Sequence, residues 1–140
     1  MERLGAHAMP AGLHADWNDC LRMGAKGEST FVAFQLYYAM SVIKDMASER
    51  NDIEYVSYIE KVQSELGASL EKCWDGDRFI RGIREDGVIV GAKNDPEASM
   101  WLNPQSWSVI SKFASNKQAE DALNSVHDIL NLSLIHISEP

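Results

Sequence analysis

The chain has 140 residues, of which 45% are hydrophobic, and it carries a formal net charge of −8. This length suits one domain with a buried core, or one part of a larger domain. The acidic balance argues against nucleic acid and anionic membranes as partners, because both attract positive surfaces. A local cationic cluster could still bind phosphate. We see no signal peptide and no run that is apolar enough to span a bilayer, and therefore expect a cytoplasmic protein.

The cysteines and histidines do not indicate a metal site. The two cysteines, Cys20 and Cys73, are far apart and form no CxxC pair. This spacing predicts neither a disulfide framework nor a zinc site, and we expect both cysteines to be small buried hydrophobic residues or inert thiols. The histidines show no metal-ligand spacing, so the sequence implies no metal.

The first segments are predicted to be loops. Residues 1–13 contain Gly and Pro and show no clean periodicity. The next stretch, HADWNDCL (14–21), holds two carboxylates three residues apart with Trp17 between them. Asp and Asn favour turns and caps, so a simple turn explains this composition. A sugar site explains it too, because a Trp face can stack on a sugar while a carboxyl transfers a proton.

Two helices are predicted after the Gly-containing segment 22–28. Ser29 can cap the first helix, which ends near the segment ERND. Apolar residues then recur at helical spacing a second time, from about 56 to 70. The apolar residues at helical spacing are Phe31, Phe34, Tyr38, Val42 and Met46 in the first helix, and Val56, Ile59, Val62, Leu66 and Leu70 in the second.

The helical period breaks between 73 and 95, where a β-hairpin is predicted. Two short β-type runs, RFIRGI and VIVG, flank the turn-forming pair Asp86-Gly87. Trp74 is expected to pack beneath this hairpin.

Helices resume after the hairpin. Asn103 is the predicted cap of a third helix, with Pro104 at its first position. A fourth helix is expected over 117–130, and its predicted buried face consists of Ala119, Ala122, Leu123, Val126 and Leu130.

The elements together predict an all-α fold with one inserted β-hairpin. Antiparallel helix pairs with long loops at one end fit part of an α/α toroid, and a small helical bundle is the alternative. The final run LSLIHISEP (132–140) does not fit this pattern, because its apolar residues have nothing left to pack against. It resembles translated sequencing adapter. We therefore expect a non-native tail, and a native chain that continues beyond about residue 131.

Five segments in chain order resemble a known family. They are GLHADWNDCL (12–21), GES (27–29), CWDGDRFIRG (73–82), DGVIVGAK (86–93) and NPQSWSVIS (103–111). Together they resemble the cellobiose phosphorylase branch of glycoside hydrolase family 94, over roughly residues 8–130. Members of that family have an (α/α)6 catalytic barrel and are several times longer than this chain. The resemblance therefore implies that residues 1–131 are one part of such a barrel.

The resemblance also implies roles for the DWND motif. Asp19 matches the family's general acid, and Trp17 matches a residue in the subsite of the transferred sugar. Asp16 belongs to the same motif and is counted with Trp17 as a substrate-binding candidate. A role in shaping the turn and orienting Asp19 fits Asp16 and Asn18 better.

The implied reaction is an inverting phosphorolysis. Phosphate would cleave cellobiose, or a related β-glucoside, into α-glucose 1-phosphate and glucose. An inverting hydrolase needs a second carboxylate to activate water, whereas phosphate is already an anionic nucleophile, so one carboxylic acid suffices. That acid must be protonated, which apolar contact with Trp17 or the charge of Asp16 would favour. The hexosyltransferase implied here needs phosphate as co-substrate and no other cofactor.

Two alternatives remain open at this point. One is a truncated, non-catalytic helical module that binds carbohydrate. The other is an inverting glycosidase on the same barrel, which would need a second catalytic carboxylate. Members of the family often form dimers, so the full-length protein is expected to be a homodimer.

We predict that the 140-residue chain alone has no phosphorylase activity. Its candidate cations Arg22, Lys26 and Lys93 are single charges in polar loops, and reacting groups must be held in register for proximity to act. Incubation with cellobiose and phosphate, followed by an assay for glucose 1-phosphate, checks this. Phosphate-dependent release of that product would contradict it.

Overall fold

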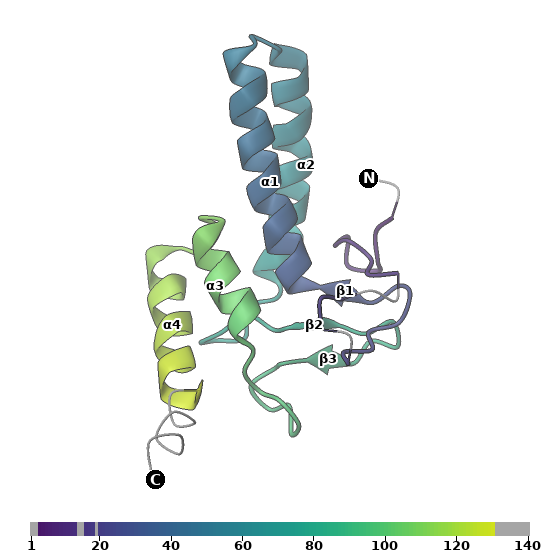
Figure 1. Cartoon of the computed structure of the whole chain (residues 1–140), viewed down its shortest axis with the longest axis vertical. Coiled ribbons are helices and arrows are strands. Elements are labelled where there is room, and N and C mark those ends of the chain that lie inside the picture. Colours follow the sequence, from purple (N-terminus) through teal and green to yellow (C-terminus); the bar gives the residue numbers. More distant parts are fainter. Residues whose placement is uncertain (1–2, 14–15, 19, 131–140) are drawn as a thin grey trace.

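The computed structural model describes residues 3–13, 16–18 and 20–130, and contains four helices and a three-stranded sheet (Figure 1). This confirms the expected helical piece with an inserted hairpin. Both Asp19 and the expected tail, 132–140, lie outside the described residues. In chain order the elements are β1 (Glu28–Ser29), α1 (Thr30–Glu49), α2 (Ile53–Glu71), β2 (Gly82–Ile83), β3 (Ile89–Val90), α3 (Leu102–Ile110) and α4 (Asn116–Leu130).

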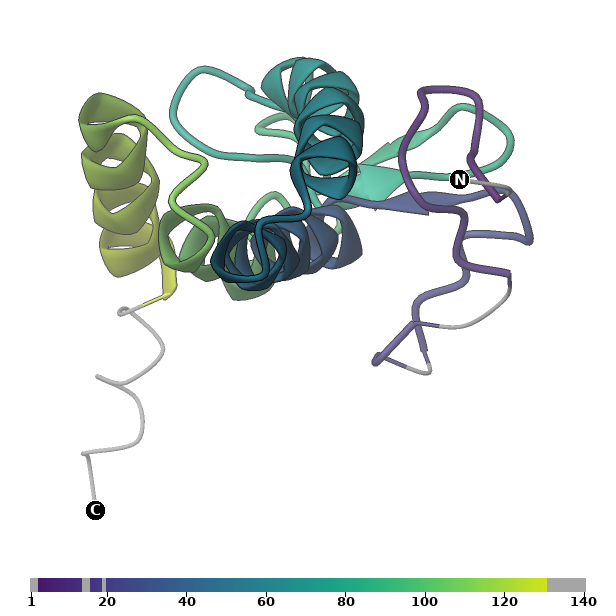
Figure 2. The ribbon, with the colours of Figure 1, turned by 90° about the horizontal axis from the view of Figure 1, so that it is seen from above.

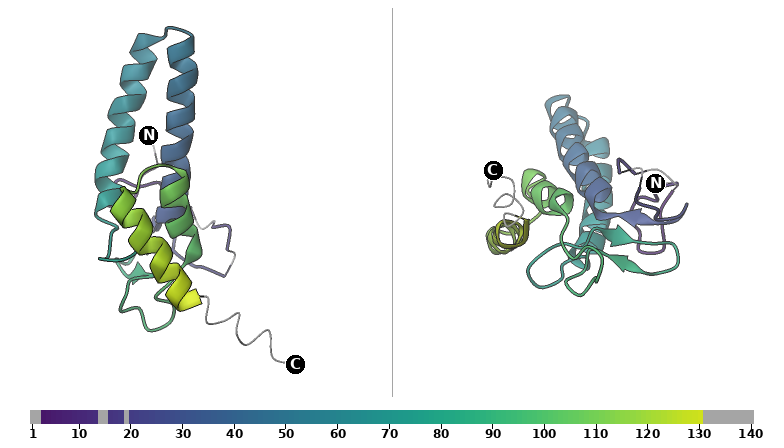
Figure 3. Two further views of the ribbon diagram at one scale, coloured as in Figure 1. Left: turned by 90° about the vertical axis from the view of Figure 1, so that its left-hand side faces the viewer. Right: turned by 60° about the horizontal axis from the view of Figure 1, so that its bottom comes forward.

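Helices α1 and α2 form a long antiparallel hairpin whose far half extends beyond the other elements (Figures 1 and 3). Ser29 caps α1 as predicted, since its Oγ accepts a hydrogen bond from Val32 N at 3.4 Å. Asp52 caps α2 by accepting a bond from Tyr55 N at 3.1 Å, so α2 begins three residues before the first residue of its predicted apolar series. Asn51 makes the turn between them in the left-handed conformation.

Only the first two residues of the apolar series in α1 are buried. Phe31 and Phe34 are buried, whereas Tyr38, Val42 and Met46 are 42%, 41% and 58% exposed. A helix turns once every 3.6 residues, so positions spaced by four drift steadily around its surface. The face that stays in the core further along α1 carries Met40 and Ala47 instead.

The sheet contains one strand that the sequence analysis did not predict. Strand β1 pairs antiparallel with β2, and β2 pairs antiparallel with β3. The Asp86-Gly87 turn is confirmed: Gly87 N donates to Arg84 O at 2.9 Å, and Gly87 has a φ of 85°. Gly82 permits close pairing with β1, because a Cβ there would overlap the carbonyl oxygen of Glu28. The sheet lies beside the N-terminal end of α1 (Figure 2).

Helices α3 and α4 lie on the other side of the α1–α2 hairpin from the sheet (Figure 2). The predicted start of α3 is wrong by two residues, because Leu102 begins the helix and Asn103 is not its cap. Pro104 is then its third residue, which is tolerated because N–H groups of the first turn have no intrahelical acceptor. In α4, Ala122 is buried as predicted, but Leu123 is exposed.

A buried glutamine joins α3 to the segment before β2. Gln105 is fully buried; its Oε1 accepts a bond from Phe79 N and its Nε2 donates to Phe79 O, both at 2.8 Å. The side-chain amide thus bonds to both the N–H and the C=O of Phe79, the two backbone groups that a neighbouring strand would otherwise bond. Phe79 in turn packs against Trp74, with ring centroids 4.8 Å apart, which confirms the packing role expected for that tryptophan.

We predict that Gln105→Ala destabilises the fold by about 3 kcal/mol, because it leaves two buried backbone groups of Phe79 without partners. Urea denaturation measures the free energy of unfolding. Gln35→Ala on α1 is the matched control, for which we expect a change of less than about 0.5 kcal/mol. Equal effects of the two substitutions would contradict this account of Gln105.

The pKa of Asp77 lies at about 2, because its carboxylate accepts bonds from Arg78 Nε at 2.7 Å and Lys93 Nζ at 2.8 Å. The pKa is lower in the folded than in the unfolded state. The ionised carboxylate therefore stabilises the fold above about pH 4, and this contribution is lost as the pH falls toward 2.

We predict that Asp77→Asn removes part of the loss of stability between about pH 4 and 2, and lowers stability at pH 7 by about 1 kcal/mol. Denaturation at a series of pH values checks both effects. The exposed Asp45, substituted in the same way, is the control. An unchanged pH profile in Asp77→Asn would show that this carboxylate does not contribute.

Candidate active site

The described part of the DWND motif, residues 16–18, forms a turn in the long loop segment that precedes β1. Asp16 Oδ1 accepts a hydrogen bond from Asn18 N at 3.1 Å, and Asn18 Oδ1 accepts one from Cys20 N at 3.1 Å. Short polar side chains that bond to the backbone two residues on are typical of such turns. These bonds confirm that Asp16 and Asn18 shape the turn.

Arg81 attaches this turn to the rest of the fold. Its guanidinium is fully buried and donates from Nη2 to Asp16 Oδ1 and from Nη1 to Ser29 Oγ, the latter at 2.7 Å. The same group lies 5.7 Å from the ring centroid of Phe31 and 5.5 Å from that of Trp101. One side chain therefore contacts the turn, the start of α1 and the residue before α3.

Trp17 presents most of its ring to solvent. The residue is 63% exposed, and its ring packs edge-on against the ring of Phe31, with centroids 6.5 Å apart. Phe31 also contacts Trp107, at 6.1 Å. An exposed indole face held by an aromatic neighbour is suited to stacking on the apolar face of a sugar ring.

Unlike the ring of Trp17, the carboxylate of Asp16 is buried. Only 3% of its side chain is exposed, because the carboxylate lies against Arg81. This burial favours turn shaping over direct contact with substrate. Asp19 lies outside the described residues, so its assignment as general acid stays a prediction.

The two cysteines differ in burial, and only Cys73 is a buried residue. Cys20 is exposed, because it belongs to the turn rather than to a helix or the core. Cys73 is buried as expected. Burial, together with the nearby charge of Glu28, raises the pKa of Cys73 to about 12.

The partners of Glu28 were not predicted from the sequence. Its buried carboxylate accepts bonds from Met9 N and His7 N, each at 3.0 Å, and pairs with His7 Nδ1 at 2.6 Å. These contacts hold the N-terminal segment against β1. Arg81 was also not predicted as a functional residue. Its position as a charged residue within the apolar run FIRGI could have indicated a buried role.

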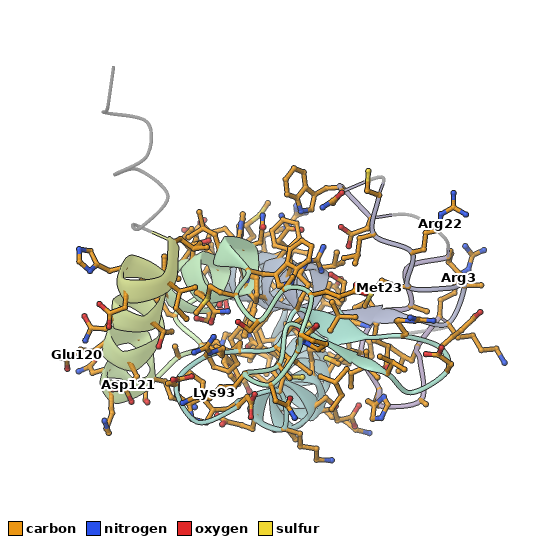
Figure 4. All side chains as sticks on the ribbon, turned by 90° about the horizontal axis from the view of Figure 1, so that it is seen from below. Arg3, Arg22, Met23, Lys93, Glu120 and Asp121 are labelled. Atoms are coloured by element: carbon orange, nitrogen blue, oxygen red, sulfur yellow. The ribbon has the colours of Figure 1, made fainter. Side chains whose placement is uncertain are left out.

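Cationic side chains do not converge on a phosphate site within the described residues. Arg3 and Arg22 extend from the N-terminal segment at one end of the molecule, well away from Lys93 (Figure 4). Lys93 pairs with Asp77 at 2.8 Å. The described residues also contain no group of three potential metal ligands, and none of their helices meets the length and hydropathy of a membrane span.

Comparison with known proteins decides the family. The whole chain, residues 1–140, matches the Glycosyl hydrolase 94 superfamily, catalytic domain. The chain belongs to this superfamily. The family-level expectation is therefore confirmed.

Characterised relatives of this glycosyl hydrolase 94 chain include several phosphorylases. It is 33% identical over 135 residues to the N,N'-diacetylchitobiose phosphorylase of Vibrio furnissii, covering 92% of the chain and 16% of that relative. For the solabiose phosphorylase of Paenibacillus borealis the identity is 31% over 139 residues, covering 91% and 17%. For the cellobionic acid phosphorylase of Neurospora crassa it is 32% over 120 residues, covering 83% and 15%.

The glycosyl hydrolase 94 chain spans only 15% to 17% of the length of these relatives. The names of these relatives give three different substrates, none of them cellobiose.

We predict that one thiol per chain reacts rapidly with a disulfide reagent at pH 8. Cys20 is exposed, whereas Cys73 is buried with a raised pKa and reacts only on unfolding. Absorbance of the released thiolate counts the reactive groups with and without denaturant. Cys20→Ser should abolish the fast phase. Two fast thiols in the native chain would contradict the burial of Cys73.

Proposed function

We propose that this chain is part of the catalytic barrel of an inverting phosphorylase, which transfers a β-linked glycosyl group from a disaccharide to inorganic phosphate. The observation that carries the proposal is the exposed Trp17 ring on a turn that Arg81 fixes, directly before Asp19. Membership of the glycosyl hydrolase 94 superfamily and the phosphorylase relatives support it.

The proposed mechanism uses one carboxylic acid. Asp19 gives its proton to the glycosidic oxygen as the bond from that oxygen to the anomeric carbon breaks. A phosphate oxygen attacks the same carbon from the opposite face, which yields an α-glycosyl phosphate and a free sugar. Trp17 stacks on the transferred sugar, and Asp16 holds the turn. The phosphate is bound by residues outside this piece.

Cellobiose is the substrate that we propose, on the form of the HADWNDCL segment. The named relatives are phosphorylases of N,N'-diacetylchitobiose, solabiose and cellobionic acid, so the substrate differs among them. The full-length protein is proposed to be a cytoplasmic homodimer with no cofactor beyond phosphate.

The exposed apolar face of α1 supports the toroid. Tyr38, Val42 and Met46 are 42%, 41% and 58% exposed, and of the three the Tyr38 ring meets Trp107 of α3 with centroids 6.2 Å apart. Further helices of an (α/α)6 barrel would cover such a face, because an amphipathic helix buries its apolar side against a neighbour. The share of the relatives' length that this chain spans agrees with several missing helix pairs.

Two competing functions make different demands. An inverting glycosidase on the same barrel would release sugar without phosphate. A non-catalytic relative would bind sugar without turning it over. The dependence of product formation on phosphate separates all three.

We predict that Asp19→Asn in the full-length polypeptide lowers the rate of phosphorolysis by at least about 10²-fold, since the amide cannot supply the proton. The measurement is the phosphate-dependent formation of glycosyl phosphate. Asp45→Asn, on an exposed part of α1, is the control and should retain full activity. Activity of Asp19→Asn within about threefold of the parent would assign the acid to another residue.

A further inference from the structure

The ion pair between Arg81 and Asp16 is buried but incompletely bonded. Arg81 is fully buried, and the Asp16 side chain nearly so. Among the described residues, Arg81 Nε and Asp16 Oδ2 have no hydrogen-bond partner. The pair therefore makes a single contact, Nη2 to Oδ1, where a guanidinium and a carboxylate could make two.

Such a pair is poorly explained by stability alone. Removing two charges from water is costly, and unsatisfied polar atoms add to that cost. Apolar side chains of similar volume often stabilise a fold as well or better. What an apolar side chain cannot do is fix the direction of a carboxylate.

The guanidinium is itself held in one orientation. It lies 5.7 Å from the ring centroid of Phe31 and 5.5 Å from that of Trp101, and Ser29 Oγ accepts a bond from Nη1 at 2.7 Å. Because the guanidinium group is planar and rigid, these contacts fix the plane in which Nη2 can donate. Asp16 Oδ1 accepts one of the bonds that Nη2 can donate in this plane.

A continuous series of hydrogen bonds runs from this guanidinium to both neighbours of Asp19. Arg81 bonds to Asp16 Oδ1, which also accepts a bond from Asn18 N at 3.1 Å. Asn18 Oδ1 then accepts a bond from Cys20 N at 3.1 Å. The residues immediately before and after the proposed acid are thus bonded in one series that begins at the cap of α1.

We propose that Arg81 is a positioning residue for the phosphorylase reaction: through Asp16 it holds the turn at residues 16–18, so that Trp17 stays in register with the bound sugar. This inference rests on the proposed function. It assigns Arg81 no contact with substrate. Its loss should lower kcat, because a small displacement of a reacting group is costly to the rate. The KM for phosphate should change little, because phosphate is bound elsewhere.

The first test measures the turn and does not depend on activity. The 140-residue chain is labelled with 5-fluorotryptophan, and Trp17→Phe assigns the Trp17 signal in its ¹⁹F NMR spectrum. Arg81→Met should shift or broaden that signal and leave the signal of Trp74 in place. Arg84→Met is the control, because Arg84 is an exposed arginine of the hairpin turn, paired with Asp86. A Trp17 signal that is unchanged in Arg81→Met would overturn the proposal.

A double variant keeps this test decisive if Arg81→Met fails to fold. Asp16→Leu combined with Arg81→Met removes both charges, so no unpaired charge remains buried. We expect it to unfold at a temperature close to that of the parent, with the Trp17 signal still displaced. A parent-like Trp17 signal in the folded double variant would equally overturn the proposal.

The second test is kinetic and uses the full-length polypeptide. We expect Arg81→Met and the double variant to lose about 10²-fold in kcat, with the KM for phosphate within about threefold of the parent. Arg81→Lys should recover part of the loss, since an ammonium group can still pair with Asp16 but lacks the fork geometry. Full kcat in the folded double variant would overturn the proposal. If the unsubstituted polypeptide shows no phosphorolysis, the proposed function fails, while the ¹⁹F spectra still decide whether Arg81 holds the turn.

Discussion

The buried guanidinium of Arg81 constrains the whole end of the molecule that carries the DWND motif. A charge without water must have partners close by, so Asp16 and Ser29 must lie within bonding distance of it. Arg81 is also part of the backbone of the sheet region, since its N donates to Val90 O at 2.8 Å and its O accepts from Thr30 N at 3.2 Å. The turn, the first helix and the hairpin therefore meet at one residue.

Two other buried polar side chains act in the same way on neighbouring segments. Glu28 binds the N-terminal segment through backbone N–H groups of His7 and Met9, and Gln105 binds the backbone of Phe79. Each side chain forms hydrogen bonds with backbone groups of a segment that has no regular secondary structure. Apolar side chains could not form these bonds. The helices supply a rigid base, and these three side chains fix the loops upon it. Loops held on a rigid base are where binding and catalytic groups usually lie.

Local patterns predicted the elements well and their long-range contacts poorly. Periodicity located the helices, and the Asp86-Gly87 pair located the hairpin, because both signals depend on near neighbours in sequence. Strand β1 was missed because its two residues become a strand only by pairing with Gly82 and Ile83, far along the chain. Helical spacing did not show which residues of α1 are buried, because burial depends on which neighbours are present: Met40 and Ala47 are buried, whereas Val42 and Met46 are exposed.

The same distinction applies to the candidate site. The turn-forming role of Asp16 and Asn18 could be predicted from composition, and the family from ordered motifs. The part played by Arg81 could not, because nothing local links position 81 to position 16. Side chains along a strand point alternately to its two faces, so an arginine within FIRGI could have faced the solvent. Only the fold shows that Arg81 is fully buried.

The measurement that tests the proposed chemistry most directly is the stereochemistry of the product. Cellobiose and phosphate are mixed with the full-length polypeptide, and ¹H NMR follows the anomeric signals from the first turnovers. One acid with phosphate as the nucleophile predicts an α-glycosyl phosphate that forms at the rate at which the disaccharide is consumed. A β-glycosyl phosphate, or free sugar released without phosphate, would contradict the account.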